Sequence, residues 1–171
     1  MEKIKVLIEE NDIEKRIKEL ANEIMNDYKD EEIVILSVLR GAIFFTVNLT
    51  KNISNKMKFE FVELSSYGEN QTSSGIVKIS KEIRSDLSGK NILIVEDIID
   101  TGITMKYLKE HLESFKPKTV KIASLLSKPE RRIEDINIDY IGFEVPNKFI
   151  VGYGFDDKEF LRNLPFIGYI E

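Results

Sequence analysis

Residues 92–105 read Ile-Leu-Ile-Val-Glu-Asp-Ile-Ile-Asp-Thr-Gly-Ile-Thr-Met, which indicates a strand, a turn and the start of a helix. The apolar run at the beginning of the segment is typical of a buried strand. Three carboxylates follow it, those of Glu96, Asp97 and Asp100, and a Thr-Gly-Ile-Thr turn then leads into apolar residues at helical spacing. The segment therefore predicts a strand whose carboxyl end is lined with acids and runs into a helix.

The rest of the chain alternates between strand and helix patterns. Asn11 and Glu14 predict an N-cap with a capping-box partner, and apolar residues then recur at helical spacing as far as Ile24. Further helices are predicted at about residues 41–53 and from residue 105, and strands at residues 33–38, 59–64, 76–79, 92–95, 120–126, 140–145, 150–152 and 166–170. This order predicts one α/β domain over residues 1–171, with a mostly parallel central sheet flanked by helices. In such sheets ligands bind beyond the carboxyl ends of the strands.

Composition narrows the classes of protein that fit. The chain has 171 residues, 42% of them apolar, which is enough for one sizeable core. Its apolar runs are shorter than the ~20 residues that a membrane span needs. Cysteine is absent, which excludes a disulfide framework and any cysteine nucleophile, and a net charge of −5 argues against general nucleic-acid binding. We expect a cytoplasmic enzyme.

The segment after residue 95 combines anion-binding N–H groups with carboxylates, and a simple ligand rarely binds both. Helix starts rich in Gly and Thr bind anions through free N–H groups and the helix dipole, yet three carboxylates would repel a bare phosphate. A ligand that carries a phosphate together with hydroxyls or a bound cation satisfies both, and a phosphorylated ribose with Mg²⁺ is such a ligand. The alternative is an ordinary capped strand-to-helix connection, but capping alone does not need three acids.

The form Val-Glu-Asp-Ile-Ile-Asp-Thr-Gly at residues 95–102 resembles the phosphoribosyl-pyrophosphate signature of the type I phosphoribosyltransferases, in particular the hypoxanthine-guanine branch. The resemblance implies that Glu96 and Asp97 orient the ribose hydroxyls, directly or through metal-bound water. It implies that Asp100 accepts a proton or hydrogen bond from purine N7. The implied phosphoribose site comprises Glu96, Asp97, Asp100, Thr101, Gly102, Ile103 and Thr104, and the implied Mg²⁺ site comprises Glu96, Asp97 and Asp156.

Two further segments resemble the parts of this family that hold the pyrophosphate and cover the site. Arg40 and Gly41 match the pyrophosphate loop, where the family has a non-proline cis peptide, although the family commonly has Lys at position 40. Arg162 is implied to reach the same group. Ser66 and Tyr67, in the polar loop of residues 65–75, match the family's catalytic lid. Without the resemblance, Arg40 reads as a surface charge and the loop as a long hairpin connection.

The purine-binding segments of the family have counterparts at residues 128 and 146–156. The resemblance implies that Lys128 donates to the 6-oxo group of the base, because an ammonium has only donors and cannot accept from the amino group of adenine. Phe149 is implied to stack on the base, with backbone groups of Lys148 and Ile150 reading its edge. Otherwise Lys128 would be an exposed turn residue and Phe149 a core residue. The single histidine, His111, is assigned no role.

As a whole, the resemblance implies the type I phosphoribosyltransferase fold with a small hood from the terminal segments. It implies the Mg²⁺-dependent transfer of a 5-phosphoribosyl group to N9 of a 6-oxopurine, by a homodimer or homotetramer. The preference among hypoxanthine, guanine and xanthine stays open. Other readings are a regulator that keeps the site but binds RNA or protein, and an unrelated Mg²⁺-dependent domain such as a response-regulator receiver. The receiver would need acids on different strand ends, whereas here they cluster on one loop.

Overall fold

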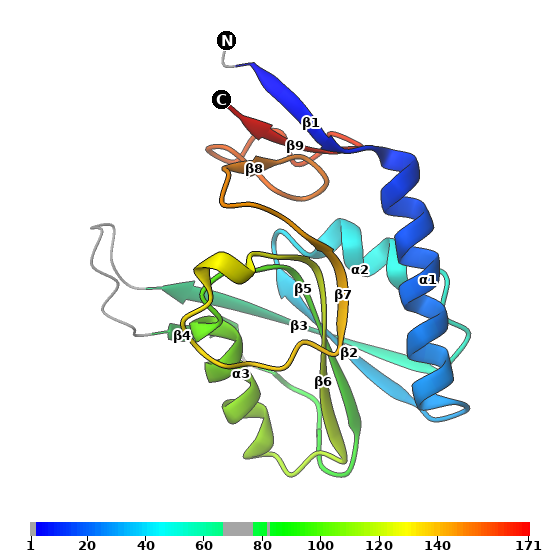
Figure 1. Cartoon of the computed structure of the whole chain (residues 1–171). Helices are drawn as coiled ribbons and strands as arrows, with labels where there is room; N and C mark the ends of the chain where they lie inside the picture. The colour runs from blue at the N-terminus through cyan, green and yellow to red at the C-terminus, as the bar shows by residue number, and fades with distance from the viewer. Residues whose placement is uncertain (1–2, 67–76, 82) are drawn as a thin grey trace.

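The computed structural model describes residues 3–66, 77–81 and 83–171. Its main sheet has six strands in the order β4-β3-β2-β5-β6-β7. The strands from β3 to β7 run parallel, and β4 is antiparallel to β3, which confirms the mostly parallel sheet (Figure 1). The six strands are β2 (Ile33–Leu39), β3 (Met57–Ser66), β4 (Val77–Lys81), β5 (Asn91–Ile99), β6 (Thr119–Ser127) and β7 (Tyr140–Glu144).

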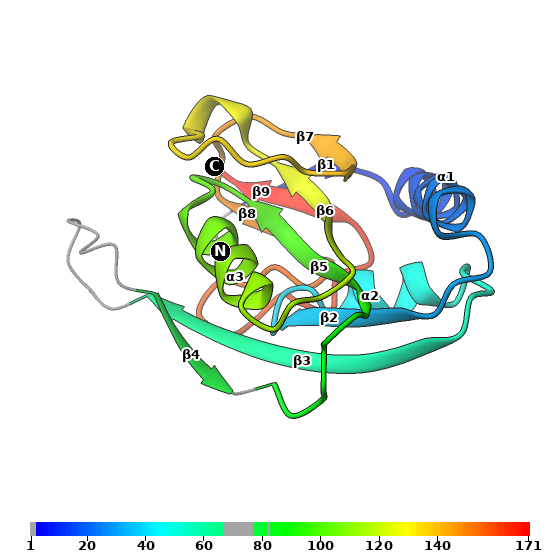
Figure 2. The same cartoon turned by 90° about the horizontal axis from the view of Figure 1, so that it is seen from below.

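Helices cover both faces of this sheet, because successive side chains of each central strand point to opposite faces and are apolar on both. Ile33 and Ile35 of β2 pack in one core cluster with α1 (Glu10–Tyr28) and α2 (Ile43–Thr50). Val34 and Leu36 pack in a second cluster with α3 (Ile103–Glu113). Figure 2 shows α3 on the side of the sheet away from α1 and α2. The continuous apolar strands are therefore buried on both faces, as expected of parallel strands.

The start of α1 differs from the expectation. Glu9, not Asn11, occupies the N-cap position, and its side chain makes no capping hydrogen bond. Asn11 lies within the first turn, where Glu10 and Asp12 place negative charge next to the positive end of the helix dipole. The prediction of a capping box at Asn11 was wrong because the helix begins earlier than the first apolar residue suggests.

Strand β5 also extends further than expected. Its pairing with β6 continues past the apolar run, with Ile98 opposite Leu126 and Ile99 opposite Ser127. Glu96 and Asp97 therefore lie within the strand and only Asp100 lies beyond it. Because the backbone of these two residues belongs to a hydrogen-bonded strand and not to a loop, the sheet fixes their positions.

A second, three-stranded sheet forms the hood at the top of the molecule in Figure 1. It consists of β1 (Ile4–Ile8), β9 (Ile167–Ile170) and β8 (Ile150–Val151), all antiparallel. This confirms the hood of terminal segments. The strand expected at residues 150–152 therefore lies outside the main sheet, and β1 was not expected. In the part of the chain that the structure describes, no helix is long and apolar enough to cross a membrane.

Candidate active site

Three adjoining cavities lie at the carboxyl ends of the main strands, where ligands of parallel sheets bind. Their volumes are about 470, 130 and 390 Å³. Asp97 and Arg162 line both the first and the third, and Asp100 lines both the first and the second. The polar residues that follow β2, β5 and β6 therefore share one crevice, as expected of polar clusters at the carboxyl ends of parallel strands. Most of the cluster expected after residue 64 lies outside the described residues. We label the cavities, in the order given, by the part of the substrate that the resemblance assigns to each: the base cavity, the phosphate cavity and the pyrophosphate cavity.

The phosphate cavity is built on the turn between β5 and α3. Thr101, Gly102 and Thr104 line it together with Glu96 and Asp100, whereas Ile103 is not among its lining residues. Gly102 precedes α3 with a φ of 86°, a left-handed conformation that side chains rarely adopt. The first N–H groups of α3 have no partner within the helix, so the turn offers donors to an anion.

Arg132 braces this turn, a role that the sequence did not reveal. Its Nε donates to the carbonyl oxygen of Asp100 at 3.1 Å, and its Nη2 donates to Oγ of Ser127 at 2.9 Å. A Cβ on Gly102 would lie 3.1 Å from Cδ of Arg132. The phosphate turn and the end of β6 are thus fastened together by one side chain.

Glu96 and Asp97 form a pair of neighbouring carboxylates, the first buried and the second half-buried. Glu96 is buried and accepts the N–H of Asp97 at 2.9 Å, while Asp97 accepts the N–H of Ile98 at 2.6 Å. Burial raises the pKa of Glu96 well above its usual value, and the neighbouring charge of Asp97 raises it further. Burial also raises the pKa of Asp97. The pair is therefore suited to hydroxyl donors or a cation, which would relieve the buried negative charge.

The carboxylates of the site could supply only part of the coordination shell of Mg²⁺. Among the described residues, no three His, Asp or Glu side chains are grouped so that they could hold a metal ion by themselves. Asp156 lines the base cavity with Asp97, but it is ion-paired with Arg162 at 2.8 Å. Mg²⁺ is usually held by one or two carboxylates together with water and substrate phosphates. The oxygen donors present match that pattern.

The pyrophosphate cavity depends on two close backbone approaches. The Leu39–Arg40 peptide is cis, as the resemblance implied. A Cβ on Gly41 would lie 1.6 Å from Oδ2 of Asp97, so a larger residue there would displace that carboxylate. A Cβ on Gly154 would lie 2.1 Å from the carbonyl oxygen of Gly41. Segments from three parts of the sequence therefore meet closely at Gly41.

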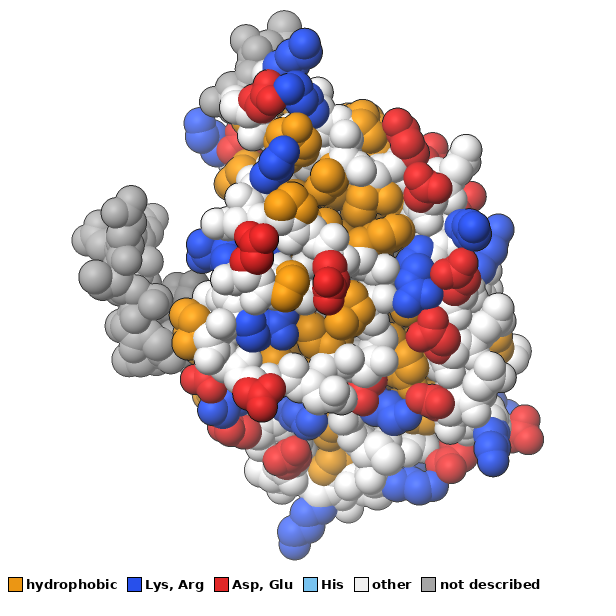
Figure 3. All heavy atoms as spheres, viewed as in Figure 1, with side chains coloured by type: hydrophobic (Ala, Val, Ile, Leu, Met, Phe, Trp, Pro, Cys, Tyr) orange, Lys and Arg blue, Asp and Glu red, His pale blue; other side chains and the backbone are white. Residues whose placement is uncertain are grey.

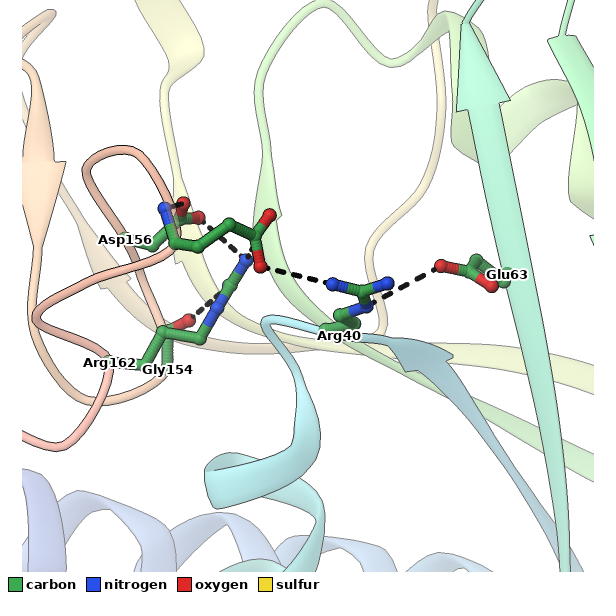
Figure 4. Close-up of polar contacts among 6 residues, drawn as sticks. Arg40, Glu63, Gly154, Asp156 and Arg162 are labelled. Atoms are coloured by element: carbon green, nitrogen blue, oxygen red, sulfur yellow. Dashed lines mark hydrogen bonds and ion pairs between the residues drawn. The ribbon is translucent and has the colours of Figure 1, made fainter.

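Two arginines line this cavity, and Figure 4 shows their contacts. Arg162 donates Nη1 to the carbonyl oxygen of Gly154 at 2.7 Å. Arg40 is ion-paired with Glu159 at 3.0 Å and with Glu63 at 3.7 Å. The sequence identified both arginines but neither of the glutamates, because they lie far from Arg40 in the chain.

The base cavity brings together the predicted purine-binding residues. Lys128 is buried, and its Nζ donates to the carbonyl oxygen of Lys148 at 2.8 Å. Burial lowers the pKa of Lys128 below the ordinary lysine value of 10.5. Phe149 is 56% exposed, so it is not a core residue, while Ile150 next to it is buried. Lys128 is likewise not the exposed turn residue that exposure statistics favour.

Asp100 lines the base cavity as well, where Arg131 donates Nε to its Oδ1 at 2.6 Å. Arg131 belongs to the short 3-10 helix at Pro129–Arg131 and was not predicted. Ser66 ends β3, and Tyr67 lies outside the described residues, so the lid stays a prediction. His111 lies on α3 against the ring of Phe115, away from all three cavities.

Comparison with known proteins adds independent information. The family model of the phosphoribosyl transferase domain matches residues 7–158. The hypoxanthine-guanine phosphoribosyltransferase of Aquifex aeolicus is 46% identical over 170 residues, which cover 99% of this chain and 96% of that protein. The Bacillus subtilis protein of the same name is 46% identical, over 98% of this chain and 93% of its own length. A crystal structure of a Bacillus anthracis hypoxanthine-guanine phosphoribosyltransferase matches with a TM-score of 0.95 at 45% identity, covering 99% of this chain and all 100% of that one.

Proposed function

The chain belongs to the phosphoribosyltransferase family, and we propose that it transfers the 5-phosphoribosyl group of phosphoribosyl pyrophosphate to hypoxanthine or guanine. The products are IMP or GMP and pyrophosphate. The observation that carries this proposal is the base cavity, where the buried ammonium of Lys128, the exposed ring of Phe149 and the carboxylate of Asp100 line one space next to the phosphate cavity. A base and a phosphorylated ribose can occupy these two cavities side by side.

Each cavity then serves one part of the substrates. The N–H groups and hydroxyls around Thr101, Gly102 and Thr104 hold the 5-phosphate. Glu96 and Asp97 accept hydrogen bonds from the ribose hydroxyls. Carboxylates of Glu96, Asp97 or Asp156 would hold Mg²⁺ directly or through water, and the ion, when bound, would supply positive charge that offsets the charge of phosphoribosyl pyrophosphate.

The residues also account for how the reaction proceeds. Positive charge develops on the ribose as the bond to pyrophosphate breaks, so the protein must position the base and stabilise the leaving group. Arg40 and Arg162 supply positive charge in the pyrophosphate cavity. Asp100 accepts the proton or hydrogen bond of N7 on the base. Lys128 donates to the 6-oxo group, which selects 6-oxopurines over adenine.

The test is turnover with defined substrates. The protein is incubated with phosphoribosyl pyrophosphate, Mg²⁺ and one of hypoxanthine, guanine, xanthine or adenine, and nucleotide and pyrophosphate are quantified by chromatography. We expect IMP and GMP to form at enzyme-like rates, and a chelator to stop the reaction. If no base yields nucleotide, the reading as an enzyme fails and a regulator that retains the site becomes the better account.

We further propose that residues 1–171 act as one domain in the cytoplasm, in a homodimer or homotetramer. Supporting an oligomer, α2 carries large apolar side chains that are partly exposed: Ile43 at 44%, Phe44 at 37% and Val47 at 45%. These three positions share one face of the helix. Sedimentation of wild type and Val47→Glu tests this interface. A wild-type monomer would overturn the oligomer, and an unchanged mass in the variant would exclude α2 as the contact.

A further inference from the structure

Glu159 places one carboxylate between both arginines of the pyrophosphate cavity. Its Oε2 lies 3.0 Å from Nη1 of Arg40, and its Oε1 lies 3.9 Å from Nη2 of Arg162. Figure 4 shows these two arginines reaching into the same space from different loops. Two oxygens of one anion therefore bridge two guanidinium groups, which is the contact that a phosphate group would make in this cavity.

The backbone around Glu159 fixes where its side chain begins. Asp157 and Phe160 exchange both backbone hydrogen bonds, at 3.1 and 3.0 Å, which closes a two-residue turn. Lys158 and Glu159 form its tip with φ values of 50° and 71°, as in the type I′ turns that close tight hairpins. The carboxylate of Asp156 also accepts the N–H of Glu159 at 2.7 Å. The turn thus presents Glu159 to the cavity.

The side chain of Glu159 can move away from the arginines. Its exposed fraction is 67%, and that of Arg40 is 63%, so the pair can separate without opening the core. Arg40 also has Glu63 as a second carboxylate neighbour, 3.7 Å from its Nε. The cationic charge of the cavity is therefore partly neutralised by carboxylates of the protein.

We propose that Glu159 is an internal competitor of pyrophosphate. In the free protein its carboxylate pairs with Arg40 and Arg162, and the pyrophosphate group of the substrate displaces it on binding. After transfer of the ribosyl group, the carboxylate competes again for the arginines and so favours release of pyrophosphate. This proposal rests on the proposed function, because it assigns the cavity to pyrophosphate. The phosphate cavity lies outside these contacts, so binding of a nucleoside monophosphate does not require the displacement.

The expected size of the effect follows from the two ion pairs. Exposed ion pairs are individually weak, and losing two of them corresponds to about threefold to tenfold in a dissociation constant. Glu159→Gln keeps the shape of the side chain but removes its charge. The variant should therefore bind pyrophosphate and phosphoribosyl pyrophosphate about threefold to tenfold more tightly than wild type. The gain should shrink at high salt, which screens exposed charges.

The experiment is a calorimetric titration of wild type, Glu159→Gln and Asp157→Asn with inorganic pyrophosphate in Mg²⁺ buffer, and separately with IMP. Asp157→Asn is the matched control, because it removes one charge from the same turn. We expect tighter pyrophosphate binding in Glu159→Gln alone, with binding of IMP unchanged in all three proteins. Steady-state kinetics should show a lower KM for phosphoribosyl pyrophosphate in Glu159→Gln.

Three results would overturn the proposal. Equal or weaker pyrophosphate binding in Glu159→Gln would show that the carboxylate does not compete. An equal gain in Asp157→Asn would assign the effect to net charge rather than to displacement. If wild type binds neither pyrophosphate nor IMP, the proposed function fails and this proposal fails with it, whereas normal wild-type binding with no change in the variant refutes only the role of Glu159.

Discussion

Replacing Lys128 by Met tests the basis of purine selection most directly. The substitution keeps the length of the side chain but removes the ammonium, which lies in the base cavity with its Nζ 2.8 Å from the carbonyl oxygen of Lys148. An ammonium can only donate, so it favours the 6-oxo group of hypoxanthine and opposes the 6-amino group of adenine. Met neither donates nor repels, and the preference should weaken.

The expected magnitude follows from the hydrogen bond that is lost. Hydrogen bonds to charged groups contribute about 1.5–3 kcal/mol, which corresponds to about 10- to 150-fold in kcat/KM. We expect kcat/KM for hypoxanthine to fall by that factor in Lys128→Met, while the value for adenine stays the same or rises. Burial lowers the pKa of Lys128, so the wild-type preference should also decline with rising pH before the ordinary lysine value of 10.5 is reached.

The assay measures kcat/KM for hypoxanthine, guanine, xanthine and adenine at saturating phosphoribosyl pyrophosphate and Mg²⁺. Lys90→Met is the matched control, because Lys90 is ion-paired with Glu32 and immediately precedes β5, at the opposite end of the sheet from the site. The control should keep the wild-type preference. A ratio of hypoxanthine to adenine in Lys128→Met that equals the wild-type ratio would refute the assignment.

Three further substitutions test other parts of the site. Asp100→Ala should lower kcat by about 10²- to 10⁴-fold with a much smaller change in the calorimetric affinity for phosphoribosyl pyrophosphate, and near-normal turnover would remove Asp100 from the mechanism. Gly41→Ala puts a Cβ 1.6 Å from Oδ2 of Asp97; overpacking costs ~1–3 kcal/mol, so the variant should lose about that much unfolding free energy in thermal melts, and unchanged stability would contradict the close approach. Burial raises the pKa of Glu96 in the folded protein above the ordinary value of 4.5. The protonated side chain therefore contributes to stability fully below pH 4.5, and this contribution is lost as the pH rises through the pKa of the folded state. Glu96→Gln should therefore gain about 1 kcal/mol or more over wild type in unfolding free energy at pH 8 and little at pH 4, and thermal melts showing a pH-independent difference would refute this.

The sequence was sufficient for the main sheet because its central strands are continuous apolar runs. It could not place the end of β5, since Ile98 and Ile99 keep their pairing to β6 and no residue in the segment marks where the ladder stops. The prediction therefore put Glu96 in a loop although it lies in the strand. Strand ends are set by partners elsewhere in the chain, which a local pattern does not contain.

Site residues that belong to a local sequence motif were predictable. Residues that only the fold brings into the site were not. Lys128 and Phe149 lie in one cavity, as the resemblance implied. Arg131 against Asp100 and Glu159 against Arg40 are 31 and 119 residues apart in sequence, and nothing in the local sequence of either pair predicts the contact. Hood strand β1 was missed for the same reason, because four of its five residues pair with β9, far along the chain.

The hood has a consequence for how the protein could lose one activity and keep another. The N–H of Ile170 donates to the carbonyl oxygen of Phe149, and Ile4 pairs with Ile170, so the base cavity is supported by strands near both ends of the described chain. The phosphate cavity is instead built on β5 and α3 of the main domain. Local opening or proteolytic trimming of the hood would then abolish base recognition first. What remains is a folded main sheet with an intact phosphate cavity, so a brief digestion would convert a transferase into a protein that holds a 5-phosphate but no base.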